Sequence, residues 1–200
     1  MIDTHCHIDE EAFAADREAV IARQREAGVE AMIVPGVNVA SIETVLDVCH
    51  AHPGYCFPAL GLHPEDVKAD WESALATVEK AIRAHRDELV AIGEIGLDYY
   101  WDTTFKEQQK EVLRRQLLLA RELDLPVILH NREATEDILR IVQDAQRATL
   151  NAPRSTLNFC SKRMHLTWRL FRIAANGMRV VGWRLWPTVW RRRSTPPQKR

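Results

Sequence analysis

The chain has 200 residues, of which 46% are hydrophobic and 28% charged, and its formal net charge is −1 at pH 7. This length suits one domain with a substantial core. No apolar run is long enough to cross a membrane, and we expect no secretory signal because no basic region precedes an apolar stretch at the N-terminus. The four cysteines form no Cys-x-x-Cys pair. We therefore expect free thiols in a reducing, cytoplasmic location.

Apolar strands alternate with amphipathic helices over the first 145 residues. The expected strands are residues 1–5, 31–36, 57–62, 89–95 and 126–130. The expected helices are residues 11–27, 41–50, 71–85, 104–123 and 135–145. Continuous apolar strands in this order indicate a parallel sheet buried on both faces. Such a sheet is either open and doubly wound or closed into a (β/α)8 barrel.

Two histidines stand at the end of the first expected strand, in the run Asp3-Thr4-His5-Cys6-His7. Residues i and i+2 of a strand face the same side, so both imidazoles can aim at one point. Neutral imidazoles at this spacing suit a divalent cation such as Zn²⁺. Asp3 has the same parity and is a further candidate, either as a third ligand or as a partner of one imidazole. The alternative is a polar N-terminus with two solvated histidines.

Ligand-type residues also lie at or near the ends of three later strands. His63 follows the third strand, Glu94 lies inside the fourth, and His130 ends the fifth. A site built from many strand ends is how a (β/α)8 barrel works, and no Gly-x-Gly-x-x-Gly follows the first strand to support a dinucleotide fold. We therefore predict a TIM-type barrel. His130 alone could equally be a hydrogen-bonded core histidine.

Glu94 lies between Ile92-Gly93 and Ile95-Gly96, in an otherwise apolar strand. A buried carboxylate needs a partner, a metal or a proton. The flanking glycines permit close approach by a ligand or unusual backbone angles. A carboxylate can bridge two cations about 3.5–4 Å apart, and such metal pairs hydrolyse phosphoesters.

The motifs Asp3-Thr4-His5-Cys6-His7, Gly61-Leu62-His63-Pro64, Gly93-Glu94-Ile95-Gly96-Leu97-Asp98 and Leu129-His130-Asn131-Arg132 resemble, in order and spacing, those of the TatD family of metal-dependent hydrolases. The resemblance covers residues 1–145. It implies a (β/α)8 barrel of the amidohydrolase kind, two divalent ions (Mg²⁺, Mn²⁺ or Zn²⁺) and deoxyribonuclease activity. It implies that His5 and His7 are first metal ligands, that Glu94 bridges and that His130 binds the second metal. We expect Glu94 and His130 to carry catalysis. His63, Asp98 and Arg132 match other motif positions, which implies roles in orienting groups or binding phosphate.

Residues 146–200 depart from the family pattern. Residues 1–144 hold all 28 acidic and 14 of the 27 basic residues, a net charge of −14, whereas residues 145–200 hold 13 basic residues and four of the six tryptophans. The family continues with a His-Cys-Phe-Ser/Thr-Gly-like strand end and a later Glu-Thr-Asp, whose aspartate is a metal ligand and the expected base. Asn158-Phe159-Cys160-Ser161 lacks the histidine, His165 is the nearest substitute, and no acidic residue follows Asp144. The chain is also shorter than a usual member, so we expect an incomplete barrel of about five β/α units, residues 1–145, with an atypical tail, residues 146–200.

Three interpretations of the tail remain: a frame-shifted continuation, which the loss of acids favours, a basic nucleic-acid-binding extension, or a divergent sixth unit. Its strand-like runs are residues 156–160 and 178–185. Three functions also remain. The chain is a hydrolase of phosphodiesters such as DNA, an amidohydrolase acting on an ester, lactone or amide, or a defective remnant that binds metal weakly. The sequence predicts no oligomeric state.

Overall fold

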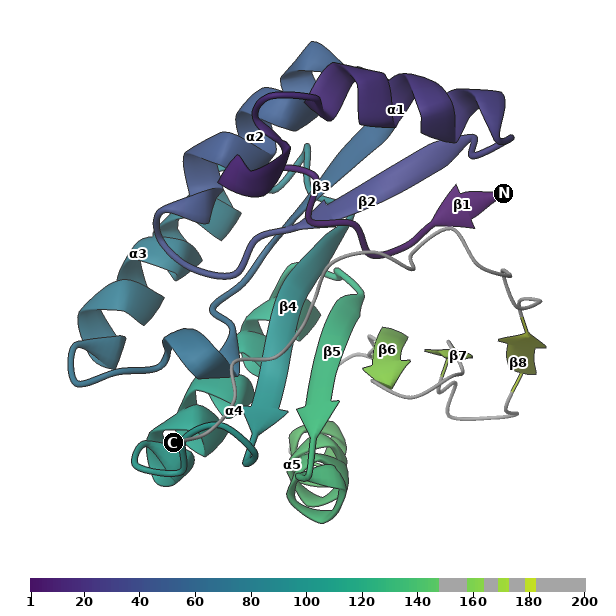
Figure 1. Ribbon diagram of the computed structural model, residues 1–200. Helices are drawn as coiled ribbons and strands as arrows, with labels where there is room; N and C mark the ends of the chain where they lie inside the picture. The colour runs from purple at the N-terminus through teal and green to yellow at the C-terminus, as the bar shows by residue number, and fades with distance from the viewer. Residues whose placement is uncertain (148–157, 164–168, 173–178, 183–200) are drawn as a thin grey trace, which may run out of the picture.

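Figure 1 shows the fold of the chain in a computed structural model. The structure describes residues 1–147 and, as backbone only, residues 158–163, 169–172 and 179–182. The strands are β1 Ile2–Asp3, β2 Ala31–Pro35, β3 Cys56–Leu60, β4 Ala91–Asp98, β5 Val127–Arg132, β6 Asn158–Arg163, β7 Arg169–Arg172 and β8 Arg179–Gly182. The α-helices are α1 Arg17–Glu26, α2 Ser41–Ala51, α3 Trp71–Ala84, α4 Lys106–Glu122 and α5 Thr135–Arg147, with 3₁₀ turns η1 Glu11–Phe13 and η2 Pro64–Asp66.

The strands form one sheet in sequence order from β1 to β8. Strands β1 to β6 are parallel, whereas β7 pairs antiparallel with β6, and β8 pairs antiparallel with β7. The sheet formed by the first five strands is curled, and the helices lie along its outer side (Figure 1). This part of the chain is a partial TIM-type barrel, which confirms the predicted fold class.

The core lies between the curled sheet and its helices. All eight residues of β4 are buried, as expected for a strand covered on both faces. Helix α3 turns Leu75, Val78 and Ile82 inward, and these residues are three and four positions apart, as one face of a helix requires. The apolar periodicity therefore places the sheet and its helices as predicted.

Two buried glutamines of α4 fix the strand ends that carry site residues. The Gln116 side chain accepts a hydrogen bond from the backbone N–H of Leu62 at 2.8 Å and donates one to its carbonyl at 3.1 Å. Gln109 accepts a hydrogen bond from the backbone N–H of Asp98 at 3.1 Å. Because buried backbone groups need partners, these amides satisfy the chain where it leaves β3 and where β4 ends.

Several predicted element boundaries were wrong, among them the end of the fourth strand, which runs to Asp98 and not to residue 95. The first helix does not begin at residue 11: η1 comes first and α1 starts only at Arg17. The Arg17 side chain donates hydrogen bonds to the carbonyls of Ile8, Asp9 and Glu10, which holds the preceding loop against the helix start. The first strand also ends early, at Asp3, because the Asp3 carboxylate accepts a hydrogen bond from the His5 N–H at 3.2 Å and turns the chain there.

The last part of the chain holds three short strands where the sequence predicted two strand-like runs. Residues 156–160 overlap β6 and residues 178–185 contain β8, whereas β7 was not predicted. In a (β/α)8 barrel neighbouring strands are parallel, so the antiparallel pairings of β7 with β6 and of β8 with β7 depart from that plan. Among the described residues, no helix combines the length and apolarity needed to cross a bilayer.

Candidate metal centre

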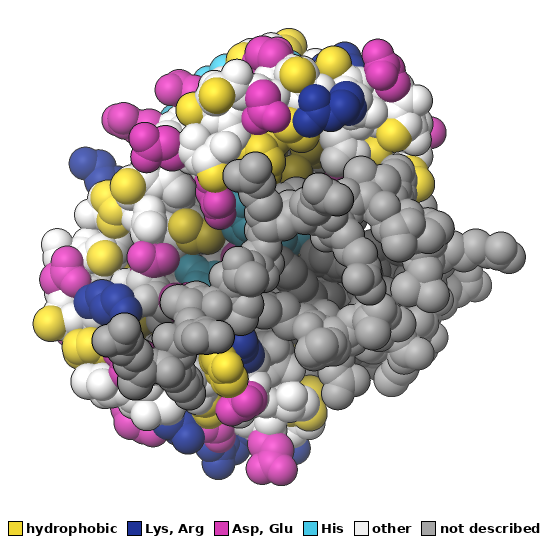
Figure 2. Space-filling model, viewed as in Figure 1, with side chains coloured by type: hydrophobic (Ala, Val, Ile, Leu, Met, Phe, Trp, Pro, Cys, Tyr) yellow, Lys and Arg dark blue, Asp and Glu magenta, His cyan; other side chains and the backbone are white. Residues whose placement is uncertain are grey.

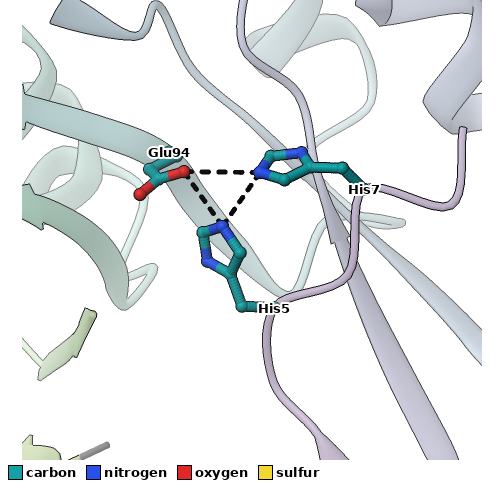
Figure 3. Close-up of side chains that lie close together, drawn as sticks. All are labelled: His5, His7 and Glu94. Carbon is teal, nitrogen blue, oxygen red and sulfur yellow. Dashed lines mark hydrogen bonds and ion pairs between the residues drawn. The ribbon is translucent and has the colours of Figure 1, made fainter. Parts of the chain in front are cut away.

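His5 and His7 lie in the loop that follows β1. The backbone N–H of Cys6, between them, donates a hydrogen bond to the Ile33 carbonyl of β2, which keeps this loop against the sheet. The two imidazoles meet with their Nε2 atoms 2.9 Å apart. Figure 3 shows both rings pointing at the Glu94 carboxylate. The i, i+2 spacing therefore places both rings at one point, although the residues lie just beyond the strand.

Glu94 lies at the centre of the cluster and is only 3% exposed. Its Oε2 lies 3.0 Å from Nε2 of His5, 3.5 Å from Nε2 of His7 and 4.0 Å from Nε2 of His63. Its Oε1 lies 3.3 Å from Nδ1 of His130. The two oxygens of one carboxylate thus face different histidines.

A second group of ligand-type atoms lies beside the first. His63, Glu65 and His130 each offer an atom within 4.8 Å of the others, as do His5, His7 and Glu94. The His63 and His130 rings meet edge to face with centroids 4.3 Å apart. The Nε2 of His130 lies 2.8 Å from the Asp98 carboxylate, which is 1% exposed. Asp98 therefore fixes the orientation of the His130 ring.

Glu94 carries a negative charge at neutral pH. Burial would raise its pKa, but hydrogen bonds with His130, His5 and His7 lower that pKa well below its usual value. His63 is held neutral, because burial and the neighbouring His130 lower its pKa to about 3. Burial would likewise lower the pKa of His130, but Glu94 and Asp98 raise it. The centre thus combines an anionic carboxylate with imidazole nitrogens, which is a donor set for divalent cations.

The glycines beside Glu94 serve strand packing. A Cβ on Gly96 would lie 2.0 Å from the His130 carbonyl oxygen, and one on Gly93 would lie 2.6 Å from Cβ of Ile128. Gly96 also has φ +153°, which side chains rarely adopt. The sequence predicted close approach by a ligand or unusual backbone angles at these glycines, and the structure shows such an angle at Gly96 and places β5 against both glycines. Close packing of β4 on β5 places His130 beside Glu94.

A cavity of about 270 Å³ opens over the cluster, with His7, His63, Glu94 and His130 among its lining residues. Figure 2 shows histidine side chains recessed in the middle of the viewed face. Glu65 and Asn131 also line the cavity, and sequence reasoning missed both. The signal for Glu65 was its place directly after the His63-Pro64 motif. Arg132 lies against aromatic rings, with its guanidinium carbon 3.8 Å from the Tyr100 ring centroid.

The described residues do not test every prediction. Asp3 holds the backbone of His5 and is not among the clustered ligand atoms of the described residues. His165 lies outside the described residues, as do residues 148–157, 173–178 and 183–200, so the three interpretations of the tail, residues 146–200, stay untested. For β6, which contains Asn158 to Ser161, only the backbone is described.

The family model described as TatD related DNase matches residues 2–164. The chain belongs to the TatD family. It is 40% identical over 144 residues to the uncharacterized metal-dependent hydrolase YabD of Bacillus subtilis, covering 72% of this chain and 55% of that protein. It is 38% identical over 143 residues to the 3'-5' ssDNA/RNA exonuclease TatD of Erwinia tasmaniensis, covering 72% and 54%.

Solved structures of the TatD family share the fold. The crystal structure of YjjV, a TatD homologue from Escherichia coli, matches with a TM-score of 0.67 and 36% identity over 72% of this chain and 56% of that one. A TatD family hydrolase from Entamoeba histolytica matches with a TM-score of 0.64 over 74% of this chain and 55% of that one. At 20% identity, that likeness concerns the fold alone. This chain spans about half the length of the relatives it matches.

Proposed function

We propose that this chain binds two divalent metal ions, of Mg²⁺, Mn²⁺ or Zn²⁺, and hydrolyses phosphodiester bonds of single-stranded nucleic acid. The observation that carries the proposal is the convergence of four imidazoles on the buried Glu94 carboxylate. Family membership supports metal-dependent hydrolysis, and the exonuclease name of the Erwinia relative supports the substrate.

The contacts of Glu94 support a bridging role. Its Oε2 faces His5 and His7, which would hold one ion, and its Oε1 faces His130, which would hold the other. His63 lies farther from Glu94, at 4.0 Å, and we assign it to orienting groups or contacting substrate. Asp98 holds the ring of His130.

When bound, divalent cations stabilise charge on a phosphoryl oxygen and lower the pKa of water. The chain's own residues supply the rest. Glu94 provides the buried negative charge that offsets the cations, and Asp98 orients His130 through a 2.8 Å contact. The cavity over the cluster, about 270 Å³, admits a phosphodiester group beside Glu94 and His130.

The scattered cysteines of the sequence support a reducing, cytoplasmic location.

Hydrolysis of a labelled single-stranded oligonucleotide tests the proposal. The full chain should release labelled product with Mn²⁺ or Mg²⁺ but not with EDTA, and Glu94→Gln should abolish that release. A parallel panel of carboxylic esters, lactones and amides tests the amidohydrolase alternative. Turnover of the panel without cleavage of the oligonucleotide would contradict the proposal, as would cleavage that survives in Glu94→Gln.

One observation favours a second candidate, a metal-binding chain with weak catalysis. No acidic residue follows Asp144 in these 200 residues, and residues 145–200 therefore hold no counterpart of the late aspartate of the family pattern. We propose that residues 1–145 form the partial hydrolase barrel and residues 146–200 a distinct basic tail. General-base catalysis is typically worth about 10²–10⁴-fold. Turnover should therefore fall at least about 10²-fold below that of a full-length relative assayed in parallel, and equal rates would show that another base acts.

A further inference from the structure

Tyr100, Trp101 and Arg132 form a surface cluster beside the metal centre, here called the aromatic platform. Tyr100 is 46% and Trp101 56% exposed, and they are the two aromatic residues among the large hydrophobics exposed in the part of the chain whose side chains are described. Their ring centroids lie 4.8 Å apart. The guanidinium carbon of Arg132 lies 3.8 Å from the Tyr100 centroid and 4.8 Å from that of Trp101.

The platform is anchored to the metal centre through one carboxylate. Oδ1 of Asp98 accepts hydrogen bonds from the backbone N–H groups of Tyr100 at 2.9 Å and Trp101 at 3.3 Å. The other oxygen, Oδ2, lies 2.8 Å from Nε2 of His130. Asp98 is 1% exposed, so water does not compete for these contacts. The backbone of Tyr100 and Trp101 is therefore held by the carboxylate that also contacts His130.

Trp101 lines a cavity that neighbours the one over the histidines, and Arg132 carries an available charge. Trp101 and Glu65 line a smaller cavity of about 70 Å³, and Glu65 also lines the cavity over the histidines. Among side chains that the structure describes, no carboxylate lies within ion-pair distance of Arg132. A surface cation–π contact alone is worth about 0.5–1 kcal/mol. This small stabilisation does not account for the exposure of two large aromatic rings.

We propose that the aromatic platform stacks a nucleobase of single-stranded nucleic acid, with Arg132 contacting a phosphate of the same strand. Stacked aromatic rings combined with an adjacent cation are how sequence-tolerant single-strand binding is built. In this arrangement, the phosphate that adjoins the stacked base in the strand lies at Glu94. The inference rests on the proposed function, and it adds the recognition of an unpaired base to the hydrolysis of a phosphodiester.

The test measures binding of the full chain to fluorescein-labelled oligo(dT) by anisotropy in EDTA, so that hydrolysis plays no part. Trp101→Ala should raise Kd roughly 5- to 150-fold, since stacking is worth about 1–3 kcal/mol per base. Trp101→Phe should restore most of the affinity. Leu118→Ala, which removes an apolar side chain 48% exposed on α4, is the control and should leave Kd unchanged. Arg132→Gln should lower the slope of log Kd against log salt by about 0.7, the value of one single-strand phosphate.

An oligonucleotide of abasic residues separates stacking from other binding. Wild type should bind it more weakly than oligo(dT), and Trp101→Ala should cause no further loss on it. Equal Kd values for wild type and Trp101→Ala on oligo(dT) would overturn the proposal, because binding would then lie elsewhere, as on the basic residues 146–200. Absence of all binding would overturn it too. Failure of the proposed function would give a different result. The chain would then bind oligo(dT) in a Trp101-dependent way but would show no hydrolysis that depends on Glu94.

Discussion

Replacing Gln116 by methionine removes the two hydrogen bonds that its amide makes with the backbone of Leu62, at 2.8 and 3.1 Å. Gln116 is 0% exposed, so water cannot replace the amide. Methionine is similarly long and unbranched, which limits the change in packing. Each buried polar group left without a partner costs about 1–3 kcal/mol. Leaving two such groups unpaired should lower the free energy of unfolding by about 2–6 kcal/mol. This is a large part of the 5–15 kcal/mol that typically stabilises a domain.

Urea unfolding followed by far-UV circular dichroism measures this loss. Gln108→Met is the matched control, because Gln108 lies half-buried on the same helix and its side chain makes no hydrogen bond with the described residues. The unfolding midpoint of Gln116→Met should fall well below those of wild type and of the control. If Gln116→Met is insoluble while Gln108→Met is soluble, that result also shows that the loss of the Gln116 amide destabilises the fold. Equal midpoints for the two variants would refute the reasoning that Gln116 completes the end of β3.

Two further predictions concern strand packing and a buried thiol. Gly96→Ala should destabilise the fold by about 1–3 kcal/mol or more, because its Cβ would meet the His130 carbonyl at 2.0 Å, whereas Gly28→Ala, with φ +82° but nothing within 4 Å, should cost about 1 kcal/mol. Thermal unfolding of both variants measures the difference, and equal losses would argue against close packing of β4 on β5. Burial raises the pKa of Cys49 to about 12, so its alkylation by iodoacetamide should rise about tenfold per pH unit from pH 7 to 9 without a plateau. Peptide mapping follows the reaction, and a plateau near the usual thiol pKa of about 8.5 would contradict it.

The alternation of apolar strands and amphipathic helices predicted most of the fold. Strand β4 was clear because its residues are apolar apart from Glu94 and Asp98, and α3 because Leu75, Val78 and Ile82 mark one face. The true start of α1 could not be predicted, because it depends on hydrogen bonds from Arg17 to a loop that only the tertiary fold places beside it. Helical periodicity alone does not show such contacts.

The candidate site could be predicted where chemistry and strand position coincide. His5, His7 and His130 are ligand-type residues near strand ends, and the structure brings all three to Glu94. Glu65 was missed because it is one exposed acid among many in the sequence, and only the 3₁₀ turn η2 brings it to the histidines. The roles assigned to these residues stay predictions.

The affinity of the chain for Mn²⁺ tests the metal centre most directly. Isothermal titration calorimetry of wild type, Glu94→Gln and His63→Ala should show that Glu94→Gln loses more affinity. Glu94 supplies a buried negative charge in contact with His5 and His130, whereas His63 lies 4.0 Å from its carboxylate. Changes outside the ligand set typically cost about 10–100-fold, so the loss in Glu94→Gln should exceed that range. Equal losses in the two variants, or Mn²⁺ binding unchanged in Glu94→Gln, would contradict a metal centre built on Glu94.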